Sequence, residues 1–339
     1  MPTLAGWPEP SRRRYDDSRV HKLVRAVRPV GARTYLRSTE SVPGASLGTL
    51  VKILVLGATG LIGSHVAEHI DALGHEVLAP TRRELDVLDP TALPLALAGN
   101  VRGDATAIDI VINCAAIADT DRAEVEPREA WRLNAHAPEH LARICYRRGV
   151  RFIHLSTELV LGASSHPDES ASCQPVGIYA RTKAEGEARV LNQTAGTALI
   201  VRTQSVYGHG GRNWSSAIAG KLLAGETIRA DTRRLVVPNS AIEVARALGR
   251  IVVLPIVDVG IAHISAQCSP TTWFDWCQQL ARELGIDPDL VIGIEHEYRV
   301  TRPNIALANS TSCQHHGAAM RSWQDALAEY ARVVREIGP

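Results

Sequence analysis

The sequence has no apolar run of the roughly 18 residues that cross a membrane as a helix. Its longest apolar region, residues 251–264, is interrupted by Pro255, Asp258 and His263. Net charge is also small, because 37 Lys and Arg stand against 36 Asp and Glu. A chain so balanced has no electrostatic reason to bind nucleic acid or an anionic membrane surface. We therefore expect neither a membrane nor a nucleic-acid partner.

The six cysteines form no C-x-x-C pair, and most stand among apolar residues as small core residues do. This pattern predicts a reduced, cytoplasmic protein without a structural zinc site, and we expect no metal. A chain of 339 residues can bury a large core. Length alone allows one large α/β domain or a domain with a smaller lobe.

Residues 1–50 differ from the rest, because Pro, Arg, Ser and Gly dominate them. Nine Lys or Arg, among them Arg12, Arg13 and Arg14, stand against four acidic residues. We expect a flexible leader. A tail of unknown use or an upstream start is the interpretation we prefer, and a basic arm that touches a polyanion is the alternative.

A glycine-rich turn follows the apolar run of residues 51–56, and an amphipathic stretch over residues 64–73 follows the turn. The turn has three glycines spaced G-x-x-G-x-x-G: Gly57, Gly60 and Gly63. Strand, tight turn and helix in this order are typical of a dinucleotide site, where backbone N–H groups approach a pyrophosphate. An ordinary βα turn is the alternative. The second apolar run, residues 75–79, disfavours it because it supplies the flank that the motif requires.

Strand-like and helix-like stretches alternate onward from residue 51, which predicts an α/β fold with a doubly wound parallel sheet. The second expected strand ends at residue 79 and is followed by Pro80, Thr81, Arg82 and Arg83. NAD-selective sites carry an acidic residue near this point that binds the adenosine ribose. Arginines in its place predict NADP(H). In the alternative, they are solvated loop charges and NAD(H) serves as well.

Small and hydroxyl-bearing residues end two later strands. The expected strand at residues 108–116 ends in Ala115 and Ala116, which leave room for a flat cofactor. The strand at residues 150–155 delivers Ser156 and Thr157 at its carboxyl end, where open α/β sheets place their ligands. These strand ends therefore predict one side of a binding site.

Tyr179 and Lys183 stand four residues apart at the start of an expected helix, so they share one helix face. A tyrosine at its ordinary pKa of about 10 transfers protons poorly at neutral pH, and a nearby cation lowers that pKa. A solvated pair on an exposed helix is the alternative. The glycine turn and the Ser156-Thr157 strand end favour the catalytic interpretation.

These motifs together resemble the extended short-chain dehydrogenase/reductases, and within them the dTDP-4-dehydrorhamnose reductases. The resemblance runs from residue 51 almost to the C-terminus. The matching stretches are Gly57-Ala58-Thr59-Gly60-Leu61-Ile62-Gly63, Asp121-Arg122-Ala123-Glu124, Asn134-Ala135, Leu155-Ser156-Thr157, Tyr179-Ala180-Arg181-Thr182-Lys183, Val201-Arg202-Thr203, Val206-Tyr207-Gly208 and Arg302-Pro303.

The resemblance implies a role for each matching residue. Thr157, Tyr179 and Lys183 are then the catalytic triad, and Asn134 helps to organise the lysine and its water. The implied cofactor residues, besides Tyr179 and Lys183, are Gly57, Thr59, Gly60, Leu61, Ile62, Gly63, Arg82, Asp86, Val87, Ala115, Ala116, Ile117 and Asn134. The implied substrate residues are Glu158, Arg212 and Asn213.

The same resemblance implies a domain plan and an activity. After the leader, residues 51–208 form a Rossmann-type NADP-binding domain. Residues 209–339 form mainly a smaller substrate-binding lobe, with some segments returning to the first domain. The activity is NADPH-dependent reduction of the 4-keto group of a nucleotide-activated 6-deoxy sugar, in a monomer or a homodimer. Tyr179 protonates the developing alkoxide, Thr157 hydrogen bonds the same oxygen, and Lys183 lowers the tyrosine pKa and binds the nicotinamide ribose.

The sequence departs from the rhamnose enzymes where the sugar should lie. After Thr157 those enzymes usually carry an acid and two aromatic residues, whereas Glu158-Leu159-Val160-Leu161 keeps only the acid. Ser205 stands where a tryptophan is usual. We therefore expect an intact triad with an altered sugar pocket. Two alternatives stay open: a nucleotide-sugar 4-epimerase or dehydratase that retains its NAD, and a non-catalytic NADP-binding regulatory subunit.

Overall fold

The computed structural model describes residues 50–97, 107–162, 167–210, 213–253, 260–266, 268–296, 305, 307 and 318–338. Residues 1–49 of the expected leader lie outside the described residues, and so do Arg212 and the Arg302-Pro303 motif.

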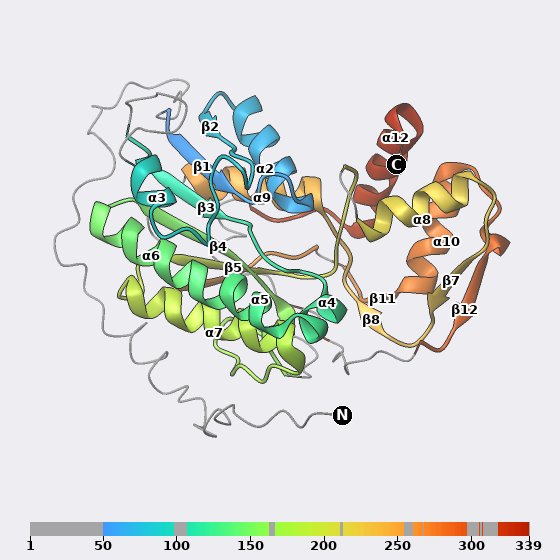
Figure 1. Cartoon of the computed structure of the whole chain (residues 1–339). Helices are drawn as coiled ribbons and strands as arrows, with labels where there is room; N and C mark the ends of the chain where they lie inside the picture. Colours follow the sequence, from blue (N-terminus) through green and yellow to red (C-terminus); the bar gives the residue numbers. More distant parts are fainter. Residues whose placement is uncertain are drawn as a thin grey trace.

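A six-stranded sheet forms the centre of the molecule (Figure 1). The strand order is β10-β5-β4-β3-β1-β2, and every neighbouring pair is parallel. The strands are β1 (Lys52–Leu56), β2 (Glu76–Leu78), β3 (Ile110–Asn113), β4 (Arg151–Thr157), β5 (Leu199–Thr203) and β10 (Gly260–His263). Because the strand order reverses beside β1, ligands are expected at the carboxyl ends of β1 and β3. The prediction of a Rossmann-type doubly wound parallel sheet is confirmed.

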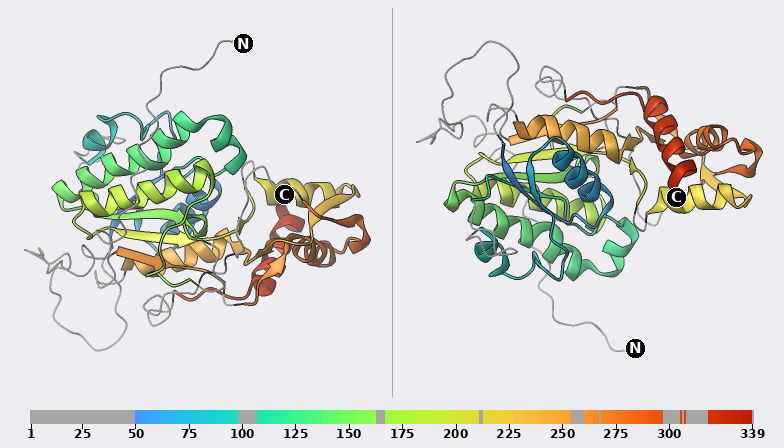
Figure 2. Two further views of the ribbon diagram at one scale, coloured as in Figure 1. Left: turned by 90° about the horizontal axis from the view of Figure 1, so that it is seen from below. Right: turned by 90° about the horizontal axis from the view of Figure 1, so that it is seen from above.

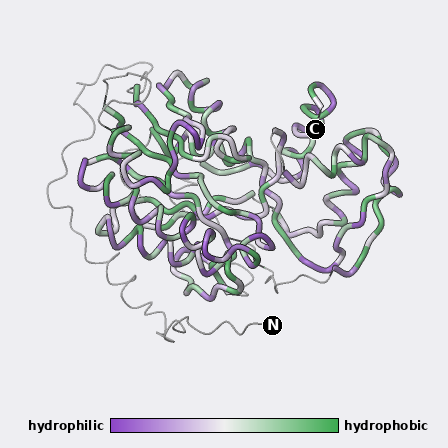
Figure 3. Tube along the Cα trace, in the orientation of Figure 1, coloured by the Kyte–Doolittle hydropathy of each residue, from purple (hydrophilic) through white to green (hydrophobic). Residues whose placement is uncertain are grey.

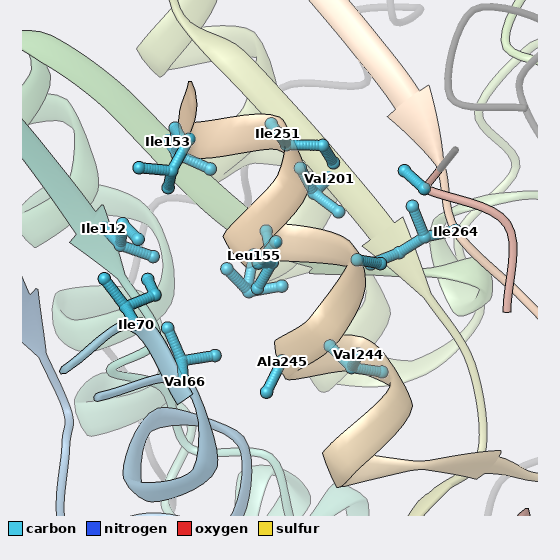
Figure 4. Close-up of a cluster of buried hydrophobic side chains, with 14 of the residues drawn as sticks. Val66, Ile70, Ile112, Ile153, Leu155, Val201, Val244, Ala245, Ile251 and Ile264 are labelled. Atoms are coloured by element: carbon cyan, nitrogen blue, oxygen red, sulfur yellow. The ribbon is translucent and has the colours of Figure 1, made fainter. Parts of the chain in front are cut away.

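Helices cover both faces of this sheet, as the two views of Figure 2 show. One face carries α2 (Leu61–Ala72) and α9 (Ala241–Val253), whose apolar side chains meet those of the strands (Figure 4). The other face carries α6 (Ala137–Arg148) and α7 (Gly177–Gln193). Burial on both faces explains why β1 is apolar from Ile53 to Leu56. The shorter α3 (Ala92–Leu95) and α4 (Thr120–Val125) lie in the connections.

A helical stretch runs over residues 127–148, and it contains a wider turn. It begins as α5 (Pro127–Trp131), passes through the π-helical turn η2 (Arg132–His136) and continues as α6. Such single π turns often occur at functional sites. Asn134 lies within this turn.

A second apolar core is built mainly by the elements after β5, at the right of Figure 1. Its central aromatic residue is Tyr207, whose ring lies 5.1 Å from Trp276 and 5.5 Å from Tyr330. Figure 3 shows apolar stretches along the strands of the central sheet and again within these elements. The elements are β6 (Val206–Tyr207), α8 (Trp214–Leu223), β7 (Ile228–Asp231), β8 (Leu235–Val236), β9 (Asn239–Ser240), β11 (Thr271–Thr272), α10 (Trp273–Leu284), η4 (Pro288–Leu290), β12 (Val291–Ile294) and α12 (Trp323–Ile337).

An ion cluster joins α12 to α9. The Arg246 guanidinium on α9 lies 2.6 Å from Glu243 and 2.8 Å from Glu329 of α12. Arg321, just before α12, lies 2.9 Å from Glu243 and also pairs with Glu329. Arg246 and Arg321 lower the pKa of Glu329 to about 2 against the opposing effect of burial. The helix that completes the second core is therefore tied to a helix that covers the sheet.

None of the described helices is long and apolar enough to cross a membrane. Within the described part of the chain, no group of three or more His, Cys, Asp or Glu is placed to hold a metal ion.

Candidate active site

The glycine turn joins β1 to α2, as the sequence predicts. Gly57 has a left-handed φ of +77°, and a Cβ there would lie 2.6 Å from the Ala115 nitrogen. A Cβ on Gly63 would lie 2.3 Å from the Gly57 oxygen. Both positions therefore require glycine, and together they bring the start of α2 against the end of β3.

The start of α2 leaves room for an anionic ligand. Thr59 and Gly60 are exposed, and Gly60 caps the helix without any side-chain hydrogen bond. The first N–H groups of a helix have no partners within it, and they attract phosphate. Leu61 and Ile62, which supply the first of these groups, are half-buried. The turn thus fits the diphosphate of a dinucleotide.

The segment after β3 forms the next part of the site. Ala115 donates its N–H to Asn113 Oδ1 (3.1 Å), Ala116 is half-buried, and Ile117 packs with Tyr179 in a small apolar cluster. Asn134 Oδ1 accepts the Ile117 N–H (2.9 Å), and its Nδ2 donates to the Ile117 carbonyl and to Thr182 Oγ1 (both 3.1 Å). In the described structure Asn134 therefore connects this segment to α7. Its expected help in organising Lys183 and its water stays a prediction.

The residues expected near the adenosine end lie after β2. Arg82 is largely exposed and pairs with Asp86 (3.4 Å) and Glu129 (3.9 Å). Asp86 also accepts the Leu88 N–H, and Val87 packs against the core under β1. Arg82 can therefore bind a phosphate only in competition with two carboxylates.

Thr157, Glu158 and Tyr179 meet at the carboxyl end of β4. The Thr157 hydroxyl donates to Glu158 Oε2 (2.7 Å) and shares a hydrogen bond with the Tyr179 hydroxyl. Leu159 N donates to Thr157 Oγ1 at 3.3 Å, and Glu158 begins the 3₁₀ turn η3 (Glu158–Val160). The structure thus brings Thr157 and Tyr179 together, and their joint role in catalysis stays a prediction.

Lys183 is buried, and its ammonium nitrogen faces β4. Nζ donates to the Leu155 carbonyl (2.6 Å) and lies 3.2 Å from His154 Nε2. Burial lowers the pKa of Lys183 to about 8, although Glu187 and Cys114 act in the opposite direction. The expected lysine is therefore at the site, in contact with the strand.

One expectation is wrong: the pKa of Tyr179 is raised, where the Tyr179–Lys183 spacing predicted a lowered value. Burial of the hydroxyl is the main cause, the Glu158 carboxylate adds to it, and the hydrogen bond with Thr157 only partly opposes them. Helical spacing identifies a shared face but contains no information on desolvation. The phenol consequently stays protonated at neutral pH, as a proton donor must.

The expected substrate residues differ in their surroundings. Glu158 is buried, and its Oε1 lies 4.0 Å from Arg234 in the connection between β7 and β8. Asn213 caps α8, where its Oδ1 accepts the Ser216 N–H (2.9 Å) and the Ser215 hydroxyl (2.7 Å). Its amide is already bonded within the helix cap. Arg212 lies outside the described residues.

Sequence reasoning missed three residues that the structure brings to the site or directly behind it. Arg234 belongs to no motif, and only the fold places it near Glu158. His154 faces Lys183 from between the apolar Ile153 and Leu155 of β4, which was the one available signal. Arg202 pairs with Glu187 at 2.7 Å within the core. Glu187 lies one turn beyond Lys183 on α7. A buried charge in a strand of the matching Val201-Arg202-Thr203 motif could have suggested such a partner.

Comparison with known proteins extends these observations. The family described as "RmlD substrate binding domain" matches residues 51–336. The dTDP-4-dehydrorhamnose reductase of Mycolicibacterium smegmatis is 33% identical over 294 residues, 84% of this chain and 86% of the relative. The dTDP-4-keto-6-deoxy-D-glucose reductase of Streptomyces niveus is 28% identical over 81% of this chain and 95% of that protein.

Solved structures share the fold. The dTDP-4-dehydrorhamnose reductase of Bacillus anthracis, in complex with NADP, superposes with a TM-score of 0.75 at 20% identity, over 83% of this chain and 99% of that one. The dTDP-glucose 4,6-dehydratase DesIV of Streptomyces venezuelae, with NAD bound, gives 0.71 at 21% identity, over 85% and 98%. Reductases and dehydratases thus share this fold, and the sequence match decides between families. Because that match covers most of the chain, the protein belongs to the RmlD substrate-binding-domain family.

Proposed function

We propose that this chain is an NADPH-dependent reductase of the 4-keto group of a nucleotide-activated 6-deoxy sugar, in the biosynthesis of deoxysugars for polysaccharides or glycosides. The observation that carries the proposal is that Thr157 and Tyr179 meet at the carboxyl end of β4, with Lys183 one turn further along α7. The names of the relatives support the substrate class, because several are dTDP-4-keto-sugar reductases or dTDP-4-dehydrorhamnose reductases.

The glycine turn and the segment after β3 would hold the cofactor. Gly57 and Gly63 form the turn, the start of α2 would receive the diphosphate, and Ala115 and Ala116 would border the nicotinamide half. Arg82 favours NADP(H), because a guanidinium binds phosphate well. Because two carboxylates already pair with Arg82, NAD(H) remains a weaker alternative. The Bacillus anthracis structure in complex with NADP supports this preference.

NADPH, when bound, supplies the hydride that reduces the ketone carbon. Tyr179 holds the proton that the ketone oxygen needs as it gains negative charge, and its raised pKa keeps that proton in place at neutral pH. Thr157 lies beside the same hydroxyl and positions the oxygen. Donors arranged before the reaction stabilise the developing charge without reorganisation. Lys183 would bind the cofactor ribose.

The surroundings of Glu158 favour a reductase over a dehydratase. A dehydratase needs an acid after the catalytic hydroxyl that can remove a substrate proton. Here the carboxylate accepts a hydrogen bond from the Thr157 hydroxyl and faces Arg234, so its oxygens are already hydrogen bonded or paired. The alternative of a non-catalytic regulatory subunit is disfavoured because a protein that only binds cofactor has no use for the Thr157–Tyr179 pair.

We also propose the domain plan that the resemblance implies. Residues 51–208 would be the NADP-binding domain, and residues 209–339 mainly the substrate lobe. Within the second part, α9 packs on the sheet and β10 extends it, which supports segments returning to the first domain. A homodimer and a cytoplasmic location stay predictions.

A panel of nucleotide-linked 4-keto-6-deoxy sugars, assayed separately with NADPH and NADH, tests the function. We expect oxidation of NADPH, followed at 340 nm, with at least one dTDP-linked ketone. Formation of a 4-keto product from a nucleotide-linked hexose, without net NADPH consumption, would support the dehydratase instead. NADPH binding without turnover on any ketone of the panel would favour the regulatory subunit.

A further inference from the structure

A chain of buried polar side chains runs behind Lys183 and takes no part in the hydride transfer proposed above. Asn113 ends β3 and His154 lies beside it on β4, where the two residues are register partners. Both side chains are almost wholly buried, at 1% and 0% exposure, and Lys183 is buried at 2%. Asn113 Nδ2 lies 3.1 Å from His154 Nδ1, and His154 Nε2 lies 3.2 Å from Lys183 Nζ.

The direction of these hydrogen bonds is fixed at the Asn113 end. A backbone N–H can only donate, so the Asn113 atom that lies 3.1 Å from the Ala115 nitrogen is the carbonyl oxygen Oδ1. The amide nitrogen Nδ2 must then face His154, and an amide nitrogen can only donate. His154 Nδ1 therefore accepts this bond.

This assignment determines the tautomer of His154. Burial lowers the pKa of His154 well below its ordinary value, so the ring is neutral and carries one proton. Because Nδ1 accepts, the proton is on Nε2, which points at Lys183 Nζ. A neutral lysine amine can accept this proton, whereas an ammonium has no lone pair to do so. A charged Lys183 could accommodate His154 only through the other tautomer, which would place two donors, Nδ1–H and Nδ2–H, against each other.

We propose that His154 is a positioning residue that stabilises the neutral amine of Lys183 through the tautomer set by Asn113. Other groups also face Lys183. Glu187 on α7 and Cys114 after β3 raise the pKa of Lys183, and burial lowers it, with a resulting value of about 8. Since an ordinary lysine has a pKa of about 10.4, Lys183 would exchange its proton within the working range of an enzyme. The catalytic use of this exchange rests on the proposed function, but the protonation state itself does not.

Lysine titration by NMR tests this proposal without any turnover. The chain has only four lysines, Lys22, Lys52, Lys183 and Lys221, so selective ¹³C-lysine labelling gives a simple spectrum. Lys183→Arg assigns the Lys183 signal. We expect that signal to titrate near pH 8. A Lys183 midpoint above about 10 would overturn the proposal.

The His154→Gln variant tests the cause of the lowered midpoint. A glutamine amide can turn its carbonyl oxygen toward Lys183 and accept from the ammonium, so the midpoint should rise by about 1–2 pH units. His140→Gln makes the same chemical change at a histidine near the surface, where its ring contacts the Pro90 carbonyl, and should leave the midpoint unchanged. An unchanged or lower midpoint in His154→Gln would mean that Nε2 accepts from the ammonium, and would overturn the proposal.

A second variant covers the case in which His154→Gln does not fold. Asn113→Asp keeps an oxygen for the Ala115 N–H and presents a second oxygen to His154, so that Nδ1 carries the proton and Nε2 accepts from Lys183. This variant should also raise the Lys183 midpoint, and a midpoint that stays near 8 would count against the proposal.

Calorimetry in two buffers that differ in ionisation enthalpy adds a binding readout. Binding of NADP⁺ should be accompanied by proton uptake near pH 8 in the parent protein. The uptake should be smaller in His154→Gln. A parent that titrates as expected but reduces no keto sugar would sink the proposed function and leave this inference intact.

Discussion

Replacing Tyr179 with Phe tests the assignment of the proton donor with the smallest change in shape. The ring keeps its packing against Ile117 and Ala123, and only the hydroxyl is lost. Thr157 keeps its bond to Glu158 (2.7 Å), so the neighbouring group should not move far. The variant therefore removes one proton from the site and little else.

The size of the effect follows from the same contacts. Loss of a general acid typically costs a factor of about 10²–10⁴ in rate. The Thr157 hydroxyl has a single proton, and it donates that proton to Glu158, so Thr157 is a poor substitute for the phenol. We therefore expect kcat to fall by a factor in the upper half of this range, equivalent to about 4–5 kcal/mol of activation free energy.

The assay follows NADPH oxidation at 340 nm with a saturating keto sugar, and nucleotide affinity is measured by fluorescence quenching. NADPH affinity should change little, because the lost hydroxyl contributes to the chemical step. Tyr146→Phe, at a half-exposed tyrosine on α6, is the matched control and should retain parental turnover. If Tyr179→Phe reduced keto sugars at the parental rate, the assignment of Tyr179 as proton donor would be refuted.

Three further predictions concern cofactor choice, stability and pH. Arg82→Ala should raise the NADPH dissociation constant about tenfold and barely change that of NADH, whereas equal losses in a binding titration would mean that Arg82 is only a loop charge. Arg202→Met should lower the free energy of unfolding in urea by about 3–5 kcal/mol, because it leaves Glu187 buried without its cation, and adding Glu187→Leu should recover most of that loss. Because the pKa of Tyr179 is raised, its phenol loses its proton only at higher pH than an ordinary tyrosine, so kcat should not fall through loss of the donor below about pH 9. A fall in kcat centred below about pH 9, with a midpoint that is unchanged in His154→Gln, would contradict this prediction.

Local chemistry explains what the sequence could predict. The glycine turn depends on residues within one short stretch, and a Cβ at Gly63 collides with the Gly57 backbone of the same turn. The Tyr179–Lys183 spacing likewise depends only on helical geometry. The alternation of apolar strands and helices predicts a parallel sheet because each strand must be buried on both faces. These features needed no knowledge of distant contacts.

Long-range packing determines the features that the sequence could not predict. The contact between Glu158 and Arg234 joins residues far apart in sequence, and no spacing rule relates them. The π turn around Asn134 has no sequence signature. A Cβ at Gly186 would lie 2.2 Å from the backbone oxygen of Asn134, so the turn depends on its fit to α7. The raised pKa of Tyr179 arises from burial, which exists only after the chain has folded.

The position of α12 has a consequence for the order in which the molecule is completed during synthesis. Trp323, Leu327, Tyr330 and Val334 of this helix fill the second core, and Glu329 is held by Arg246 of α9. Domains generally fold as units while the chain emerges from the ribosome. The strands and helices up to β10 are made before α12, so the sheet can assemble first, whereas the second core stays open until its last helix arrives. A ribosome stalled before residue 323 should therefore carry a sheet that already binds nucleotide beside a second part that is still sensitive to protease.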